Sequence, residues 1–575
     1  MGSQARGVLP RPISPLRPGP KPPYMDVDPT TVGELTRMRT EPWVKWLRRT
    51  GYANLFPEAS EEILNGIENG VDVGFHGPRD RDRDCINLRS ATECEEIAQK
   101  VDAVIAKDVR DKKKAGPFEK RPAFPHFSIS PIGAVPKKNS EKIRVIHHLS
   151  YPFGGDSINA SVDDSYQPLG SFDQAADAVR AYGRSCSLIK LDVEAAYKQV
   201  PVRRKDWPLL GFKWRGMYYY ERCLPFGLKS SCRLWELYAT ALHHFFVKST
   251  AVNAVVHYVD DFLFVVVGES VAHSALKSAL ATCDELGVPM APDKIEGPIT
   301  RLTFLGIELD TAKMEARLSE DRLSDIKRLL MDWENKSAAT VRETEQLVGT
   351  LQFAAKVVRT GRTFMRRIMD FARDGLQRTG QRDTEIKITA SLRCDIEWWR
   401  RFISKWNGIS LLYELEWIKA TKLDLTTDAC DAGFGAHYNG RWFRSDWSDS
   451  VTAEAFRLTR ISMPFYELYA LVTAAAAWGE EWCGKRIEFH CDCENVVKAI
   501  YNGTSKSHSQ AALLRHLHTI AATHGFEFKV YHIAGVDNTL ADLLSRDRMD
   551  EFFQHAPDAN KEPDSFPQLP PVADM

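Results

Sequence analysis

The feature that most constrains this chain is the stretch NAVVHYVDDFLFVVV, residues 253–267, in which two adjacent acids interrupt an apolar run. An apolar, β-branched run of this length predicts a strand that is half or wholly buried. Asp260 and Asp261 stand near its centre. A buried, unpaired carboxylate costs several kcal/mol or takes up a proton. The pair therefore needs a strong compensating partner, for which a divalent metal ion is the obvious candidate.

A third acid of the same kind stands in LIKLDVEAAYKQVPV, residues 188–202, where Asp192 ends another apolar strand and Tyr197 follows five residues later. Two-metal nucleotidyl transfer needs carboxylates from separate elements to hold two divalent ions. Such ions activate an attacking 3′-hydroxyl and neutralise charge on the phosphates. The sequence therefore predicts a metal site for phosphoryl transfer at Asp192, Asp260 and Asp261.

Five motifs in one order resemble the reverse transcriptase family. They are SPIGAVPKKNSEKIRVIHHLS (130–150), LDVEAAYKQV (191–200), LPFGLKSS (224–231), YVDD (258–261) and FLGIEL (304–309). The resemblance implies an α+β right-hand polymerase with fingers, palm and thumb. Strand-like segments with helices between them from about 126 to 310 also favour α+β over a repeating βαβ pattern.

The resemblance also implies roles around the predicted metal site. Lys137 and Arg144 match the basic residues that hold the incoming triphosphate, and Tyr197 matches a steric gate against the ribose 2′-hydroxyl. Lys294, in APDK, occupies the place of a lysine thought to protonate the pyrophosphate leaving group. Phe226 and Gly227 fall in the motif that contacts template and nucleotide, although retroviral enzymes carry Gln at the position of Phe226.

A second set of acids lies in the last third of the chain. Asp428 follows the strand-like LDLTT, Glu467 lies in the helical FYELYALVTAAAAW, Asp492 ends RIEFHC, and Asp542 lies in HIAGVDNTLADLLSR. In order and context they resemble the RNase H family, which implies a second pair of metal ions. His532, ten residues before Asp542, is similar to the mobile histidine loop of that family. Taken alone, His532 is more often a surface or loop residue.

The formal net charge is −1, so any binding of nucleic acid must come from local basic patches. One patch, residues 356–382, carries eight Lys or Arg against Asp370 and Asp374. We expect it to hold template–primer phosphates, with a solvated helix face as the alternative. The residues chosen for contact are Lys356, Arg359, Arg362, Arg366 and Arg367.

Composition and periodicity divide the chain into six parts, three of which take their names from the polymerase and RNase H features that the two resemblances imply. They are a disordered Pro-rich tail (1–35), a helical N-terminal extension (36–115), reverse transcriptase fingers and palm (116–310), a helical thumb and connection (311–412), an RNase H-like α/β domain (413–548) and a disordered acidic tail (549–575). Thr340 and Glu343 have the spacing of a capping box at a helix start.

The eleven Cys show no disulfide-like spacing, which is typical of a reducing compartment. No signal peptide and no run of about 18 apolar residues is visible, so we expect an intracellular protein of the cytoplasm, the nucleus or both.

Residues 333–370, 396–408 and 489–497 look like segments of DIRS-type retrotransposons, which mobilise with a tyrosine recombinase, and gypsy-like elements are the second choice. The implied activities are RNA-directed DNA synthesis and RNase H cleavage, each with two Mg²⁺ or Mn²⁺ ions. The implied partners are an RNA template, a DNA primer, the RNA–DNA hybrid, deoxynucleoside triphosphates and a separately encoded recombinase or integrase, with no membrane.

One alternative is a catalytically silent, domesticated nucleic-acid-binding protein, and another is a nuclease whose polymerase half is only a scaffold. All seven acids are present, which speaks against both.

Overall fold

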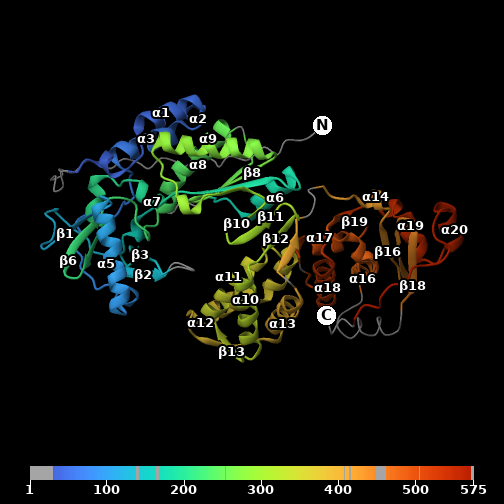
Figure 1. Cartoon of the computed structure of the whole chain (residues 1–575). Helices are drawn as coiled ribbons and strands as arrows, with labels where there is room; N and C mark the ends of the chain where they lie inside the picture. Colours follow the sequence, from blue (N-terminus) through green and yellow to red (C-terminus); the bar gives the residue numbers. More distant parts are fainter. Residues whose placement is uncertain are drawn as a thin grey trace. The chain divides into compact units, whose positions relative to one another are not determined.

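The computed structural model describes residues 30–570, apart from 137–140, 164–167, 251, 253, 407, 413–415, 448–461 and 504 (Figure 1). The chain forms two compact units. One comprises Met1–Ala175 with Cys186–Thr300, and the other comprises Ala176–Ser185 with Arg301–Met575.

The first unit begins with helices that belong to its core. They are η1 (Val32–Leu35), α1 (Thr40–Arg49), α2 (Tyr52–Leu55), α3 (Pro57–Asn69), α4 (Arg89–Thr92) and α5 (Glu95–Arg110). The buried Trp43 ring meets the Tyr238 ring edge-on, with centroids 5.7 Å apart. The side chains of Val32 and Leu35 are also buried, because these two apolar residues join the same core. The predicted disordered tail is therefore wrong for its last residues, while its first 29 residues lie outside the described part of the chain.

An antiparallel four-stranded sheet in the order β7-β8-β4-β9 forms the centre of this unit. Its strands are β4 (Ser187–Asp192), β7 (Val255–Tyr258), β8 (Asp261–Val266) and β9 (Glu296–Ile299). The single strand predicted over 253–267 is wrong, because β7 and β8 form a hairpin whose turn is Val259 and Asp260. Val259 has a φ of +55°, a left-handed conformation that is unfavourable for a β-branched residue.

Helices and two smaller sheets surround this sheet. Helices α8 (Ser231–Thr250) and α9 (Glu269–Leu286) pack against the central strands, as Figure 1 shows. The other elements are β1 (Lys114–Phe118), β2 (Ile132–Pro136), β3 (Ile143–His147), η2 (Asn159–Ser161), α7 (Ala196–Gln199), η3 (Arg204–Leu209), β5 (Gly211–Trp214), β6 (Met217–Glu221) and η4 (Pro292–Lys294). Helix α6 (Phe172–Tyr182) starts in the first unit, and its residues from Ala176 onward belong to the second. Strands β1, β6 and β5 make one sheet, and β2 with β3 makes a hairpin.

The second unit starts with a four-stranded sheet and a group of helices. Its elements up to the C-terminal α/β region are β10 (Arg301–Phe304), β11 (Ile307–Asp310), β12 (Glu315–Arg317), α10 (Glu320–Glu334), β13 (Ala338–Thr340), α11 (Val341–Ala354), η5 (Arg359–Met365), α12 (Arg366–Thr379), β14 (Glu385–Lys387), α13 (Ala390–Lys405) and β15 (Ile409–Leu411). The capping box at Thr340 and Glu343 is confirmed, since each side chain accepts a hydrogen bond from the other residue's backbone N–H. The part predicted as helical also contributes four short strands, two of them to the sheet β10-β11-β12-β15.

The C-terminal α/β region has an antiparallel sheet β16-β17-β18 and a parallel pair β19-β20, with β19 next to β16. Its elements are α14 (Ala420–Leu423), β16 (Thr426–Ala429), β17 (Gly433–Tyr438), β18 (Arg441–Asp446), α16 (Met463–Trp478), η6 (Gly479–Trp482), β19 (Arg486–Cys491), α17 (Glu494–Asn502), α18 (His508–His524), β20 (Glu527–His532), η7 (Gly535–Asp537), α19 (Thr539–Ser545) and α20 (Met549–His555). Helix α16 is buried almost all round because Ala, Leu and Val line every side of it.

The described part of the segment predicted to be a disordered acidic tail, residues 549–575, is ordered, so that prediction is wrong. It begins with helix α20, and Phe566 then packs against the core of the C-terminal region. The Asp564 carboxylate accepts a hydrogen bond from Trp478 Nε1 at 2.9 Å. The segment is acidic and Pro-rich overall, but its few apolar residues are sufficient to pack it against the C-terminal region. Among the described helices of the whole chain, none combines the length and the apolar character needed to span a bilayer.

Two candidate acidic centres

Three of the predicted acids meet at the end of the central sheet. Asp192 is the last residue of β4, and the β4–β8 register places it opposite Asp261. The N–H of Val193 donates to the carbonyl oxygen of Asp260 at 3.0 Å, which ties the hairpin turn to the end of β4. Two neighbouring strands therefore bring Asp192, Asp260 and Asp261 to one place.

The pKa values of these carboxyls reflect burial and mutual repulsion. Burial raises the pKa of Asp260, and the carboxylate of Asp192 adds to the rise, while Lys294 and Arg144 oppose it. Burial, followed by the charges of Asp260 and Asp192, raises the pKa of Asp261 to about 7. Lys294 Nζ stands 2.7 Å from Asp192 Oδ2. A cation bound among these carboxylates would relieve the remaining repulsion.

An aromatic pair stands beside these acids. The rings of Tyr197 and Phe226 have centroids 5.2 Å apart, and the Arg144 guanidinium lies over Phe226 at 5.8 Å. Gly227 has a φ of +105°, and a Cβ there would lie 2.1 Å from the carbonyl oxygen of His147, so only glycine fits. Lys137 lies outside the described residues.

A buried group of charges that sequence reasoning missed anchors the short helix that carries Tyr197. Lys198, the next residue, places its Nζ 2.5 Å from Glu221 Oε2. Lys114 Nζ lies 2.6 Å from the other oxygen of Glu221 and 3.0 Å from Asp108. The sequence did carry a signal for this group, because Lys198 and Glu221 each stand directly after a tyrosine in an otherwise largely apolar segment.

The second set of acids converges in the C-terminal region. Asp428 lies in β16, Glu467 in α16, and Asp492 directly follows β19. One carboxylate oxygen each of Glu467 and Asp492 and the Sγ of Cys491 all lie within 4.8 Å of one another. Magnesium prefers oxygen ligands, so Cys491 is a packing neighbour of this site and not a ligand of such an ion.

These acids hold protons more tightly than usual. Burial, followed by the carboxylates of Asp428 and Asp492, raises the pKa of Glu467 to about 9. Burial is also the main cause that raises the pKa of Asp428 to about 6, against a hydrogen bond donated by Ser545. Asp542, in α19, adds to the rise of the Asp428 pKa and accepts a hydrogen bond from Arg546 at 2.7 Å.

Several oxygens at this second centre are buried and lack a hydrogen-bond partner among the described residues. They are Glu467 Oε2, Asp492 Oδ1 and Asn538 Oδ1. A buried acceptor without a donor is costly, and a bound cation is one way to satisfy it. The donor set is all oxygen and mostly carboxylate, so these residues fit a magnesium-type ion.

His532 is the last residue of strand β20 and is exposed, in keeping with the alternative of a surface histidine. The parallel register with β19 places it opposite Cys491. One ring nitrogen lies 3.1 Å from the carbonyl oxygen of Asp492, and the residue is exposed. His532 therefore reaches the second centre from the end of a strand.

One known protein family matches the segment that carries the first centre. Residues 135–309 match the family model described as "Reverse transcriptase (RNA-dependent DNA polymerase)". The chain contains a reverse transcriptase domain. The matched residues include Arg144, the three acids of the first centre and Lys294.

Among curated proteins, Polyprotein P3 of Commelina yellow mottle virus is 22% identical over 424 residues, which cover 73% of this chain and 20% of that polyprotein. The chain thus spans about a fifth of the length of this relative. A foamy viral protease-reverse transcriptase solved with double-stranded DNA is similar at 14% identity and a TM-score of 0.46, over 80% of this chain and 73% of that one. The same viral protein with an RNA/DNA hybrid gives 13% identity and a TM-score of 0.44, over 90% of this chain and 64% of that one.

The basic side chains of residues 356–382 differ in their exposure and in their partners. Arg366 is exposed and lies 3.9 Å from Asp370, while Lys356 Nζ lies over the Phe353 ring at 5.5 Å. Arg367 is mostly buried and lies 3.5 Å from the buried carboxylate of Asp395. The charge of Arg367 therefore compensates a buried acid, and its predicted contact with phosphate stays a prediction. Arg362 lies with Arg359 in helix η5, and the side chain of Arg359 lies outside the described part.

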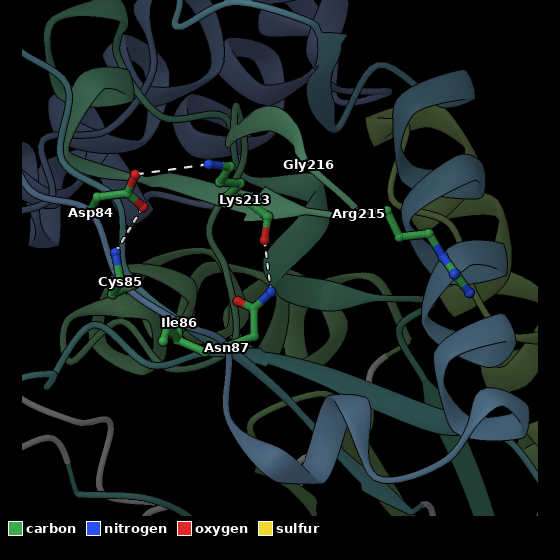
Figure 2. Close-up of a pocket in the computed structure, with 7 residues that line it drawn as sticks. All are labelled: Asp84, Cys85, Ile86, Asn87, Lys213, Arg215 and Gly216. Atoms are coloured by element: carbon green, nitrogen blue, oxygen red, sulfur yellow. Dashed lines mark hydrogen bonds and ion pairs between the residues drawn. The ribbon is translucent and has the colours of Figure 1, made fainter.

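A separate pocket of about 540 Å³ lies in the first unit (Figure 2). It is lined by residues 84–87 and by Lys213, Arg215 and Gly216. Asn87 Nδ2 donates to the carbonyl oxygen of Lys213 at 2.8 Å, and Lys213 Nζ lies 3.9 Å from Asp84. The lining contains none of the predicted site residues, so this pocket is distinct from the acidic centre of the reverse transcriptase domain.

Proposed function

We propose that this chain is an RNA-directed DNA polymerase of a retroelement, with a C-terminal RNase H domain that cleaves RNA in RNA–DNA hybrids. The observation that carries the proposal is the convergence of Asp192, Asp260 and Asp261, from two strands, beside Tyr197 within a reverse transcriptase domain. Clustered carboxylates on adjacent strands are what two-metal nucleotidyl transfer requires.

At the first centre, Asp192 and Asp260 would hold the ions and Asp261 would support them. Bound Mg²⁺ or Mn²⁺, two ions per centre, would supply activation of the 3′-hydroxyl and neutralisation of phosphate charge. Lys294, already paired with Asp192, is placed to give a proton to a leaving pyrophosphate. Tyr197 and Phe226 form an aromatic wall that would reject a ribose 2′-hydroxyl, while Arg144 and Lys137 would bind the triphosphate.

At the second centre, Asp428, Glu467, Asp492 and Asp542 would hold the second pair of ions. Ser545 and Asn538 orient Asp428 by donating hydrogen bonds to its two oxygens. His532, held near the Asp492 carbonyl, would help release the product.

The proposed substrates are an RNA template, a DNA primer and deoxynucleoside triphosphates, with the hybrid as substrate of the second centre. Exposed basic residues around Arg366 would bind backbone phosphates, so affinity should fall steeply with salt. We assign the chain to a DIRS-type element, with gypsy-like elements second, and expect a separately encoded recombinase or integrase as a partner.

Primer extension on an RNA template, together with cleavage of a labelled RNA–DNA hybrid, tests both activities. Asp260→Asn should abolish extension and leave cleavage intact, whereas Asp492→Asn should do the reverse. Asp80→Asn, an exposed acid of the first unit, is the matched control and should change neither. A wild-type chain that binds hybrid but neither extends nor cleaves would instead be a catalytically silent binding protein, and cleavage without extension would indicate a nuclease on a polymerase scaffold.

A further inference from the structure

A chain of hydrogen bonds between two buried side chains and one half-buried side chain joins helix α8 to strand β7. Glu236 and His243 lie two turns apart on α8 and so share a face of the helix. His257, the residue before Tyr258 in β7, lies between them. Its Nε2 is 3.1 Å from Glu236 Oε2, and its Nδ1 is 2.9 Å from His243 Nδ1. Glu236 is 1% exposed and His257 is 7% exposed.

The chemistry of these groups limits where the protons can lie. An ionised Glu236 can only accept, so His257 Nε2 must donate. The two Nδ1 atoms share one proton, which leaves two arrangements: His243 donates to a neutral His257, or a protonated His257 donates to a neutral His243. Both arrangements keep both hydrogen bonds. The ring of His257 is therefore held in one orientation in either protonation state.

The same helix also supports the turn of the hairpin. Trp235 Nε1 donates to the carbonyl oxygen of Val259 at 2.7 Å. The left-handed backbone of Val259 is unfavourable and persists only where its surroundings enforce it. The His257 ring also stacks on Phe262 of β8, with centroids 5.4 Å apart. Two consecutive residues of α8, Trp235 and Glu236, thus bind the residues on either side of Tyr258.

Stability alone does not account for this arrangement. A buried charged pair is often no more stable than apolar residues of the same volume. Glu236 Oε1 also lacks a hydrogen-bond partner among the described residues, which adds to the cost. What the hydrogen bonds provide and apolar packing cannot is a fixed direction and distance between α8 and β7.

We propose that Glu236, His257 and His243 are positioning residues that set the place of Asp260 and Asp261 relative to Asp192. The proposal rests on the polymerase function proposed above. The acids must lie within a fraction of an ångström of their working positions, and a displacement of about 1 Å lowers turnover about 100-fold.

Conservative and apolar substitutions separate positioning from folding. His257→Gln keeps an amide donor for Glu236 and an acceptor for His243, so it should extend primers within about 5-fold of wild type. His257→Leu should lower kcat about 100-fold with little change in KM for the deoxynucleoside triphosphate. The double variant Glu236→Leu/His257→Leu removes the unpaired charge, so it should recover thermal stability while kcat stays low. Equal kcat in the Gln and Leu variants, or a loss confined to KM, would overturn the proposal.

A second readout does not depend on polymerase activity. In full-length chains that also carry Asp492→Asn to weaken the second centre, Mn²⁺ titration calorimetry reports binding at the first centre. Positioning predicts weaker Mn²⁺ binding in His257→Leu and nearly wild-type binding in His257→Gln. Equal Mn²⁺ affinity in both variants would refute the positioning role. Failure of the wild type to extend any primer would refute the polymerase function instead, and the Mn²⁺ comparison would still decide the role of the three residues.

Discussion

Replacing Glu467 by glutamine should stabilise the ion-free protein, and the gain should grow with pH. Glu467 is 5% exposed, and burial together with Asp428 and Asp492 raises its pKa from 4.5 to about 9. Because the pKa in the folded state lies above that in the unfolded chain, folding takes up a proton. The associated stability is fully present below pH 4.5 and is lost progressively as the pH rises toward 9.

The size of the effect follows from the same values. Each pH unit between the two pKa values costs about 1.4 kcal/mol, so the loss between pH 4.5 and pH 7 is about 3 kcal/mol. Glutamine keeps the shape of the side chain and cannot ionise. Glu467→Gln should therefore match the wild type near pH 4.5 and exceed its free energy of unfolding by about 3 kcal/mol at pH 7 in EDTA.

Denaturation of the full chain followed by tryptophan fluorescence at several pH values measures this difference. Glu480→Gln is the control, because Glu480 is exposed just after α16, and its effect should stay within about 0.5 kcal/mol. Added Mg²⁺ should stabilise the wild type more than Glu467→Gln if Glu467 is a ligand. No gain for Glu467→Gln between pH 4.5 and 7, or an equal gain for Glu480→Gln, would refute the reasoning.

Four further substitutions test other parts of the chain. Gly227→Ala should lower the free energy of unfolding by more than about 2 kcal/mol in urea denaturation, because its Cβ meets a backbone oxygen at a left-handed position. Phe566→Ala should cost about 1–2 kcal/mol in the same assay if the C-terminal segment packs as described, and nothing if that segment is free. Arg366→Ala should reduce the salt dependence of hybrid binding, measured by fluorescence anisotropy, by about one phosphate contact. Arg367→Ala should lower the free energy of unfolding by about 2 kcal/mol, because it leaves the buried carboxylate of Asp395 with one fewer cation.

The acids of the first centre were predictable because each contradicts its local surroundings, whereas those of the second centre were predicted from an order and context that resemble the RNase H family. A carboxylate in an apolar strand, such as Asp192 or Asp260, has a high cost that the rest of the chain must explain. Their convergence in space also follows from local structure, since a two-residue turn and an adjacent antiparallel strand place them side by side. Short-range pattern was therefore enough for the first centre.

Long-range partners could not be predicted in this way. Arg366 and Arg367 are neighbours of identical type, yet one is exposed and the other lies beside the buried Asp395 from a later helix. Which face of a helix is covered depends on packing against distant elements, and the local basic pattern carries no such information. The C-terminal segment was predicted wrongly for a related reason. Its overall composition is that of a disordered tail, yet a few apolar residues, such as Phe552 and Phe566, pack against the folded region.

The hydrogen-bonded group behind the hairpin falls between these two cases. His257 interrupts the same apolar run as Asp260, and Glu236 interrupts the apolar LWELYATALHHFF. Both residues therefore carry the anomaly that made the acids conspicuous, a polar group where burial is expected. They differ in that their compensating partners are each other, so no ion is needed to explain them. A buried polar residue in an apolar run thus predicts a strong partner, which is either a metal ion or another buried polar side chain. Pairing such residues with one another before invoking a metal would have linked α8 to β7 from the sequence alone.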